Sequence, residues 1–343
     1  MSMFAVLLDK LQRREDLTVD EAAGAMAEIM EGRAQPSNIA ALLVGLSMKG
    51  ERPAEIVGLA RAMRRRATRL PFDGAPPEVF DTCGTGGDGA ETFNVSTAAA
   101  LVVAACGVKV AKHGNRSVSS RCGSADVFES LGVRIDAAPE IAVRCLEDAG
   151  IAFLFAPTFH PSMRHAGPTR KELGIRTAFN LLGPLTNPAG AARQLVGVPR
   201  PELTELVARS LGLLGTARAW VVHGADGLDE LSTTGYSKVS EYRDGAVNTF
   251  YVHPSEFGIA KSARADLRGG DAATNAGIIR DVLAGRAGAA RDIVLYNAGA
   301  SLLIAGRAAT LAEGIALAAE AVDAGRARDV LARLVASSQG AAA

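Results

Sequence analysis

The sequence predicts a small all-helical N-terminal domain followed by a large α/β domain with a central mixed sheet flanked by helices. Residues 1–72 carry apolar residues at helical spacing only, whereas strands, loops and helices alternate after position 78. The proline-rich stretch 70–77 separates the two patterns and is typical of a linker. A length of 343 residues agrees with about two domains. We therefore expect domains at 1–72 and 78–343.

The N-terminal helices have recognisable starts and ends. Thr18 and Glu21 form a capping-box pair before an apolar periodic run, and further helices begin after Pro36 and near Pro53. The last of these ends in the basic run 64–66, which could contact nucleic acid. Cations in the last turn of a helix interact favourably with the helix dipole, and this is the simpler explanation of the run.

Short runs rich in β-branched residues predict the strands of the second domain. They lie at 79–81, 108–111, 151–155, 195–198, 219–222 and 250–252. Helices are expected between several of them, at 94–106 and 203–214, and again over about the last forty residues. The basic, proline-punctuated stretch 161–187 interrupts this alternation. We expect it to be a helical insertion that crosses back toward the N-terminal helices.

The composition restricts the classes of partner and compartment. Apolar residues make up 48% of the chain, and Lys plus Arg equals Asp plus Glu at 37 each. A chain without net charge has no global attraction for nucleic acid or anionic membranes, so any anion site must be built locally. The four cysteines show no CxxC or metal-ligand spacing, and neither a secretory signal nor a membrane span is recognisable. We expect a cytoplasmic protein that binds no nucleic acid and no membrane.

A glycine-rich loop follows the first predicted strand. Gly84, Gly86 and Gly89 match the pattern GxGxxG, whose backbone N–H groups can converge on an anion at a helix N-terminus. The same pattern also fits a dinucleotide fold or a merely structural turn. Asp88 inside the loop would repel a bare pyrophosphate, and the next strand ends in Lys112 rather than in an acidic residue for a ribose hydroxyl. NAD binding is therefore disfavoured.

The stretch 112–120 is the most informative one in the chain. It gathers two cations, an imidazole, an amide and three hydroxyls around one glycine at the end of a strand, a composition that suits pyrophosphate and ribose oxygens better than it suits a surface loop. The segment 94–97, directly after the glycine loop, can cap the next helix, bind phosphate oxygens or a metal, or do both.

A pair of carboxylates supplies the acidic part of the predicted site. Asp229 and Glu230 follow the strand at 219–222, and neighbouring carboxylates suit Mg²⁺, which takes oxygen ligands and bridges substrate phosphates. The two could instead form a general acid/base pair. With a pyrophosphate-binding loop elsewhere in the chain, metal binding fits better. Asp226, beside Gly227, is better explained as a turn residue.

Together these motifs resemble the anthranilate phosphoribosyltransferases. These enzymes of tryptophan biosynthesis join anthranilate to the ribose of phosphoribosyl pyrophosphate with loss of pyrophosphate. The resemblance covers almost the whole chain in the expected order. The matching elements are 84–88, 94–97, 112–120, 170–177, 179–188 and 229–232.

The resemblance implies a set of ligand contacts. Phosphoribosyl pyrophosphate would be held by Gly84, Gly87, Asp88, Thr92, Asn94, Val95, Ser96, Thr97, Lys112, His113, Gly114, Asn115, Arg116, Ser117, Val118, Ser119 and Ser120, with Ser124 near the pyrophosphate. Mg²⁺ would be ligated by Ser96, Asp229 and Glu230, and anthranilate would be contacted by Gly84, Asn115 and Arg170. The resemblance also implies a homodimer formed through the helical domain, which the insertion at about 165–185 completes.

The residue chemistry agrees with that reaction. Arg170 offers a planar fork for a benzoate carboxylate, and Lys112 with Mg²⁺ can stabilise the leaving pyrophosphate. The amine of anthranilate is neutral at pH 7, so we assign no general base. His113 and His160 could accept the departing proton or could form structural hydrogen bonds.

Two other functions deserve comparison. A pyrimidine-nucleoside phosphorylase has a related fold and a similar Lys-His-Gly loop, but it has less need of the pair Asp229–Glu230. A non-catalytic relative that binds nucleic acid is disfavoured by the zero net charge and by an aromatic content of 5%.

Overall fold

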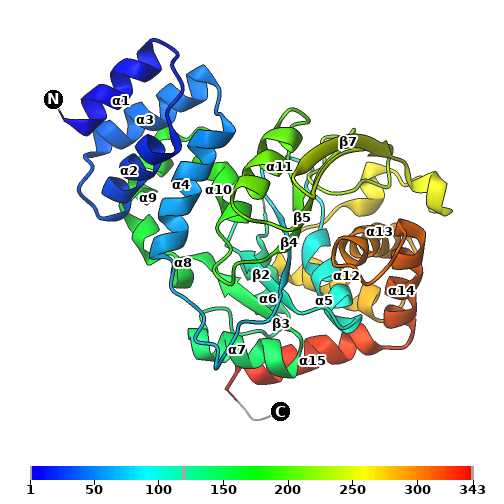
Figure 1. Cartoon of the computed structure of the whole chain (residues 1–343). Helices are drawn as coiled ribbons and strands as arrows, with labels where there is room; N and C mark the ends of the chain where they lie inside the picture. Colours follow the sequence, from blue (N-terminus) through cyan, green and yellow to red (C-terminus); the bar gives the residue numbers. More distant parts are fainter. Residues whose placement is uncertain (1, 118–120, 341–343) are drawn as a thin grey trace.

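The computed structural model, which describes residues 2–117 and 121–340, contains a bundle of N-terminal helices beside a seven-stranded sheet covered by helices (Figure 1). This confirms the predicted fold class. The helices of the N-terminal bundle are α1 Met3–Gln12, α2 Val19–Met30, α3 Pro36–Lys49 and α4 Pro53–Arg66. The strands are β1 Phe80–Gly84, β2 Val110–Gly114, β3 Ile151–Phe155, β4 Arg193–Gly197, β5 Arg218–Gly224, β6 Ser237–Arg243 and β7 Ala246–Val252.

Helices of the α/β part lie between and after the strands. They are α5 Val95–Ala105, α6 Ser124–Ser130, α7 Pro139–Asp148, α11 Leu203–Leu213, α12 Ala272–Leu283, α13 Ala289–Ile304, α14 Leu311–Asp323 and α15 Arg326–Ser338. Between β3 and β4 lies the predicted insertion, which is helical. It consists of α8 Ala156–Phe159, the 3-10 turn η1 Pro161–His165, α9 Gly167–Leu173 and α10 Phe179–Leu185. Among the described residues, no helix has the length and apolar character needed to cross a bilayer.

The sheet is mixed, and its strand order sets the position of the site. The order is β3-β2-β1-β4-β5-β6-β7, with parallel pairing from β3 to β5 and antiparallel pairing for β6 and β7. The chain leaves β1 toward β2 on one side and returns to β4 on the other. Ligands of such sheets bind beyond the carboxyl ends of the strands where the order reverses. The loops after β1, β2 and β4 therefore meet at that edge.

The sheet separates two hydrophobic clusters. Along β4 and β5 the side chains alternate, so that Leu195 and Trp220 belong to a cluster with α5 and α13, whereas Val196 and Val221 belong to a cluster with α11. This second cluster continues into the N-terminal bundle and includes α10. The bundle is thus packed onto one face of the sheet through a continuous apolar core.

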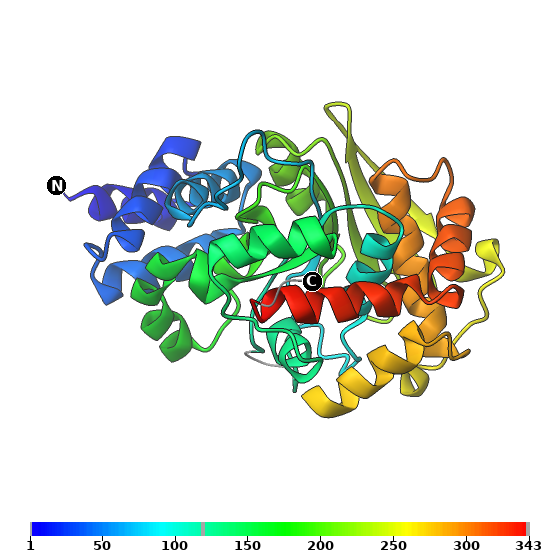
Figure 2. The same ribbon diagram turned by 90° about the horizontal axis from the view of Figure 1, so that it is seen from below.

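The insertion packs against the bundle. Helix α9 contacts α3, η1 contacts α2, and α10 contacts α4. Figure 2 shows these green segments beside the blue N-terminal helices, although they are more than a hundred residues apart in sequence. Within the bundle, the predicted capping box of Thr18 and Glu21 is present at the start of α2.

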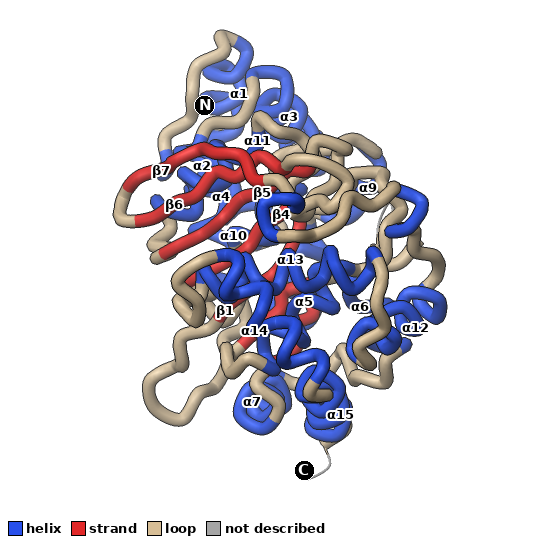
Figure 3. The backbone as a smooth tube through the Cα atoms, turned by 90° about the vertical axis from the view of Figure 1, so that its right-hand side faces the viewer, coloured by secondary structure: helices blue, strands red, loops and turns tan. Residues whose placement is uncertain are grey.

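Two strands differ from the sequence-based expectation. Strand β6 was not predicted, because its sequence Ser-Lys-Val-Ser-Glu-Tyr-Arg is mostly polar, and β7 is longer than the run 250–252. The β6–β7 hairpin forms the edge of the sheet in Figure 3. Its turn holds Asp244 and Gly245 at φ of 51° and 82°, as a two-residue hairpin requires, so the dipeptide Asp-Gly was the overlooked signal.

The second strand extends further than predicted. It runs from Val110 to Gly114 rather than over 108–111, so Lys112 and His113 lie inside the sheet and are buried. The end of this strand, rather than a loop after it, therefore brings these two side chains under the cavity described below.

Arg64 explains the basic run at the end of α4. Its Nε donates a hydrogen bond to the carbonyl of Leu185 at 2.7 Å, and its Nη1 donates to that of Leu214 at 3.0 Å. These carbonyls stand at the C-terminal ends of α10 and α11, where a cation is favoured. Burial lowers the pKa of Arg64. The run therefore contributes a clamp between the bundle, the insertion and the α/β part.

Replacement of Arg64 by Met should destabilise the fold by about 2 kcal/mol, because a charged donor and its two buried hydrogen bonds are lost. Arg65→Met is the matched control, since Arg65 is exposed on the same turn and should change stability little. Urea unfolding followed by circular dichroism measures both. Equal unfolding midpoints for the two variants would contradict the clamp.

Candidate active site

A cavity of about 1080 Å³ lies at the carboxyl edge of the sheet, between the sheet and the insertion. Its walls come from the loop after β1, the end of β2, the segment after β5 and helices α9 and α10. All of the predicted site residues that the structure describes line this cavity. Val118, Ser119 and Ser120 were predicted as well and lie outside the described residues.

The glycine loop is held by one carboxylate of the acidic pair. Asp229 Oδ2 accepts a hydrogen bond from the backbone N–H of Gly86 at 3.0 Å. A Cβ at Gly84 would collide with the same oxygen, so only glycine permits this approach. Gly86, Gly87 and Gly89 all have positive φ, which turns the loop tightly over the cavity. The two motifs are therefore in direct contact, although 143 residues separate them.

Glu230 and Lys112 meet at the first turn of α5. Glu230 Oε1 accepts a hydrogen bond from the backbone N–H of Ser96 at 3.0 Å, and the Lys112 ammonium lies 3.3 Å from the Ser96 hydroxyl. Lys112 also donates to the carbonyl of Thr82 in β1. Ser96 thus contacts an ammonium through its hydroxyl and a carboxylate through its backbone N–H, at the N-terminus of a helix.

The acidic pair holds protons near neutral pH in the absence of ligands. Burial, followed by repulsion from Asp88, raises the pKa of Asp229 to about 7. Burial and repulsion from Asp229 raise the pKa of Glu230 to about 8. Each carboxyl side chain is partly exposed to the cavity, although the surrounding protein excludes most of the water around it. A cation placed there would relieve both effects.

The donor set suits Mg²⁺. Asp229, Glu230 and the hydroxyl of Ser96 offer oxygen ligands only. No three His, Cys, Asp or Glu side chains of the described residues form a complete metal cluster. Mg²⁺ does not need one, because it is usually held by one or two carboxylates together with waters and substrate phosphates.

Arg170 presents its cation to the cavity from α9. Its guanidinium lies 4.9 Å from the centre of the Phe179 ring, and burial lowers its pKa. Within residues 2–117 and 121–340 no carboxylate forms an ion pair with it. A partly desolvated guanidinium without a counter-ion, stacked on an aromatic ring, favours binding of a planar anion.

The two histidines make structural hydrogen bonds. The Nδ1 of His113 lies 3.1 Å from the carbonyl of Gly183, and the Nε2 of His160 lies 3.0 Å from that of Thr186. Each of these nitrogens must carry the proton, because a carbonyl can only accept. Burial lowers the pKa to about 3 for His113 and to about 4 for His160. Both rings are thus neutral and weakly basic, which agrees with assigning no general base.

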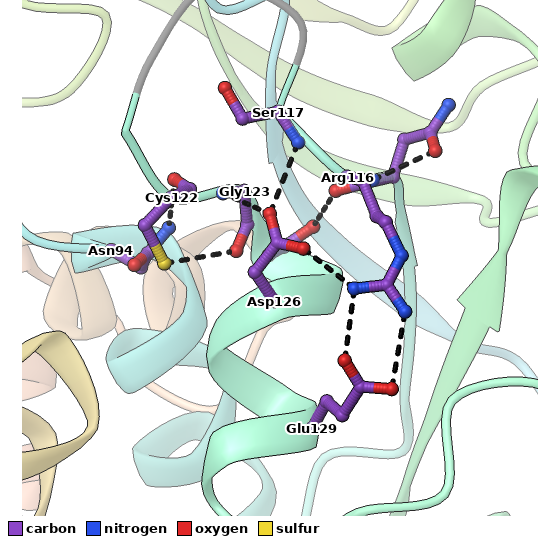
Figure 4. A network of polar contacts seen from close by, with 9 residues as sticks. Asn94, Arg116, Ser117, Cys122, Gly123, Asp126 and Glu129 are labelled. Atoms are coloured by element: carbon purple, nitrogen blue, oxygen red, sulfur yellow. Dashed lines mark hydrogen bonds and ion pairs between the residues drawn. The ribbon is translucent and has the colours of Figure 1, made fainter. Parts of the chain in front are cut away.

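Arg116 is engaged by α6. Its guanidinium pairs with Asp126 at 2.8 Å and with Glu129 at 2.9 Å, and these pairs raise its pKa (Figure 4). Asp126 also accepts hydrogen bonds from the backbone N–H groups of Gly123 and Ser117, so it joins the residue before α6 to Ser117 after β2. Helix α6 therefore holds Arg116 at the wall of the cavity.

Several cavity residues were not among the predicted site residues. Asn275 of α12 donates a hydrogen bond at 2.9 Å to the side chain of Asn94, and Arg176 lies over the glycine loop. Beneath the cavity, Asn187 donates to the buried Asp81 at 2.7 Å. Arg176 and Asn187 fall within the motifs that carry the family resemblance, which was a usable signal. Asn275 has no such signal in the sequence.

Comparison with known proteins identifies the family. Residues 5–67 match the helical bundle domain of a glycosyl transferase family, and residues 76–328 match the α/β domain of that family. An anthranilate phosphoribosyltransferase of Moorella thermoacetica is 54% identical over 334 residues, which cover 97% of this chain and 98% of that protein. The chain belongs to the anthranilate phosphoribosyltransferase family. The enzyme named anthranilate phosphoribosyltransferase 2 of Streptomyces coelicolor is also 54% identical, over 92% of this chain and 94% of its own.

Solved structures of this family have the same fold. The Thermus thermophilus anthranilate phosphoribosyltransferase superimposes with a TM-score of 0.90 at 45% identity, covering 97% of this chain and 99% of its own. The Saccharomyces cerevisiae enzyme in complex with PRPP (phosphoribosyl pyrophosphate) and Mg gives a TM-score of 0.88 at 28% identity, with 98% of both chains covered. The same yeast enzyme in complex with 4-fluoroanthranilate gives 0.86 at 27% identity, covering 98% of this chain and 99% of its own.

The raised pKa values predict how stability depends on pH. Carboxyl groups of the unfolded chain ionise near pH 4, whereas those of Asp229 and Glu230 keep their protons up to about pH 7 and 8. The folded state therefore binds more protons than the unfolded state within that window. Without metal, the contribution of these two carboxyls to stability should be fully present near pH 4 and should be lost as the pH rises toward 8. The lowered pKa values of His113 and His160 act in the opposite sense below about pH 6.5, so the net decline should appear above that pH.

Glu230→Gln should flatten this decline, because the amide keeps an acceptor for Ser96 but cannot ionise. Thermal melts in EDTA between pH 5 and 8.5 measure the effect, with Glu140→Gln on the exposed surface of α7 as the control. Parallel pH profiles for the wild type and Glu230→Gln would show that Glu230 is ionised in the folded chain at neutral pH.

Proposed function

We propose that this cavity carries out the family's reaction in tryptophan biosynthesis, the transfer of the phosphoribosyl group of phosphoribosyl pyrophosphate to the amine of anthranilate. The bond from ribose C1 to the pyrophosphate oxygen breaks, and its electrons leave with pyrophosphate. The amine nitrogen bonds to C1 and loses a proton to water, giving N-(5-phosphoribosyl)anthranilate. The observation that carries this proposal is that one cavity joins a glycine loop, an acidic pair and the unpaired cation of Arg170.

Phosphoribosyl pyrophosphate would bind along the carboxyl edge of the sheet. The tight turn at Gly86 and Gly87 would let the pyrophosphate approach the backbone closely, the N-terminal end of α5 would favour its negative charge, and Lys112 would add a positive charge. Side chains that would contact the sugar and its phosphates share the same wall of the cavity. They are Asp88, Thr92, Asn94, Ser96, Thr97, His113, Asn115, Ser117 and Ser124.

The metal would lie between the acidic pair and the pyrophosphate. Asp229, Glu230 and Ser96 are the proposed ligands, supported by the raised pKa values of the two carboxyls. Bound Mg²⁺ supplies positive charge that offsets the charge developing on the leaving pyrophosphate. The yeast relative crystallised with PRPP and Mg supports the choice of ion.

Anthranilate would bind at the insertion side. Arg170 can form a two-pronged hydrogen bond with its carboxylate, while Asn115 and Gly84 lie on the opposite wall and would contact the ring or the amine. Because the amine is already neutral, positioning beside C1 and stabilisation of the leaving group provide the catalysis. A pyrimidine-nucleoside phosphorylase is less well supported, because it gives no role to the buried pair Asp229–Glu230.

A division into domains and a dimer belong to the same proposal. We assign residues 1–72, completed by the insertion at about 165–185, to a helical domain, and 78–343 to the α/β domain; the packing of α9 on α3 and of α10 on α4 supports this.

A homodimer would form through the helical domain. Met3 and Val6 on α1 and Met48 on α3 are exposed apolar side chains that favour such a contact.

The reaction is tested by the loss of anthranilate fluorescence when protein and phosphoribosyl pyrophosphate are mixed with Mg²⁺ or with EDTA. Quenching should require Mg²⁺. Arg170→Ala should raise the KM for anthranilate about 10- to 100-fold through loss of a charge-assisted pair, with the KM for phosphoribosyl pyrophosphate nearly unchanged. Lys171→Ala, an exposed neighbour on α9, is the control. Folded protein that never quenches would overturn the proposed reaction, and phosphorolysis of thymidine and uridine would be tried next.

The dimer is tested by charge insertion. Val6→Glu combined with Met48→Glu should shift the protein from dimer to monomer in sedimentation velocity, because two carboxylates would be buried at the contact. Tyr251→Glu, at an exposed aromatic position on β7, should leave the association unchanged. Dissociation by Tyr251→Glu instead would assign the contact to the sheet edge.

A further inference from the structure

Arg176 lies over the glycine loop. It belongs to the segment between α9 and α10, and its side chain remains accessible in the cavity. A Cβ on Gly87 would collide with its guanidinium, so the two are in close contact. Its Nη2 donates a hydrogen bond to the carbonyl of Thr85 that is long, at 3.4 Å. Such a weak bond can be exchanged for a stronger one at little cost.

Two carboxylates and one cation act on the charge of Arg176. Burial lowers its pKa, and Arg200 lowers it further, whereas Asp229 and Asp88 raise it, so these two carboxylates are the anions that its charge faces. Within the described residues, no carboxylate approaches it closely enough for an ion pair. The guanidinium therefore lies near the acidic pair, in the region where a metal and a pyrophosphate are proposed to bind.

We propose that Arg176 contacts the leaving pyrophosphate and, in the ligand-free protein, faces the ionised form of Asp229. This inference rests on the proposed function of the cavity. On binding of Mg²⁺ and phosphoribosyl pyrophosphate, the guanidinium would exchange the Thr85 carbonyl for phosphate oxygens, and Asp229 would be free to hold the metal. The planar fork of Arg176 matches a phosphate edge, which an ammonium does not.

The position of Arg176 gives this contact a second consequence. The residue lies three positions after the end of α9 and three before the start of α10, on the same insertion as Arg170, and that insertion packs on the N-terminal bundle. A bond to the pyrophosphate would therefore fix the insertion over the substrate. Arg170 would then bind the carboxylate of the acceptor and Arg176 the leaving pyrophosphate, so one segment would contact both substrates.

Two measurements on Arg176→Ala test the proposal. Steady-state kinetics should show kcat/KM for phosphoribosyl pyrophosphate reduced about 100-fold, the size expected when one preorganised donor to the developing charge is lost, with the KM for anthranilate unchanged. Arg176→Lys should recover only part of the activity, because it restores the charge without the fork. Lys171→Ala serves again as the control on the same insertion.

Metal binding provides a readout without turnover. Mn²⁺ alone, titrated into substrate-free protein and followed by electron paramagnetic resonance, should bind Arg176→Ala about fivefold more tightly than the wild type, because a competing positive charge is gone. Pyrophosphate with Mn²⁺ should bind the variant more weakly than the wild type. Tighter binding of Mn²⁺ alone combined with weaker binding of pyrophosphate with Mn²⁺ is the result that only the proposed exchange predicts.

The outcomes separate the two claims. If Arg176→Ala matches the wild type in the kinetics and in both titrations, or weakens anthranilate instead, Arg176 is only a cover of the loop and the inference is wrong. If the wild type consumes no anthranilate, the proposed reaction fails, while the titrations still test the role of Arg176. Should the alanine variant fold poorly, Arg176→Gln keeps the side-chain length, and the same two titrations decide.

Discussion

Lys112 is 1% exposed, and its ammonium lies between the carbonyl of Thr82 and the hydroxyl of Ser96. Burying a cation is costly unless oppositely charged groups surround it. Three of the groups that act on it are the carboxyls of Asp81, Glu230 and Asp229, and burial nevertheless lowers its pKa. The strand β2, the first turn of α5 and the segment after β5 are thus fixed around one buried charge.

Asp81 links the strands of the site to the end of the insertion. This carboxyl is fully buried, and burial raises its pKa to about 6 against the influence of Lys112. Its oxygens accept hydrogen bonds from Asn187 and from the backbone of His113. Asn187 in turn donates to the carbonyl of Ala111 in β2. The point at which the chain leaves the insertion and enters β4 is therefore tied to the strands that carry the site.

The predicted residues that the structure brings to one cavity share one property. Gly84 ends β1, Lys112 lies in β2 and Asp229 follows β5, and the carboxyl ends of these parallel strands meet at one edge of the sheet. Local motifs were sufficient there, and the fold class followed from the change of periodicity near residue 78. Strand β6, between β5 and the edge strand β7, was missed because its sequence is mostly polar and lacks an apolar alternation.

The rest of the site depends on contacts that are remote in sequence. Asn275 bonds to a residue 181 positions away, Arg176 to one 91 positions away, and Asn187 to one 106 positions away. Arg116 shows the opposite difficulty. Its chemistry suggested a phosphate ligand, whereas Asp126 and Glu129 of the next helix hold its guanidinium. A side-chain type indicates what a residue can bind, and only the fold decides which partner reaches it first.

Two hydrogen bonds join the helical part to the sheet at nearly the same point of the chain. Arg64 of α4 binds the carbonyl of Leu185, and Asn187, two residues later, binds Asp81 in β1. Together with the apolar core that continues from the bundle to β4 and β5, these bonds fix the end of the insertion against the sheet. Arg170 and Arg176 precede Leu185 by 15 and 9 residues, so both cations enter the cavity from a segment whose end is anchored to the bundle and to the buried charges beneath the site.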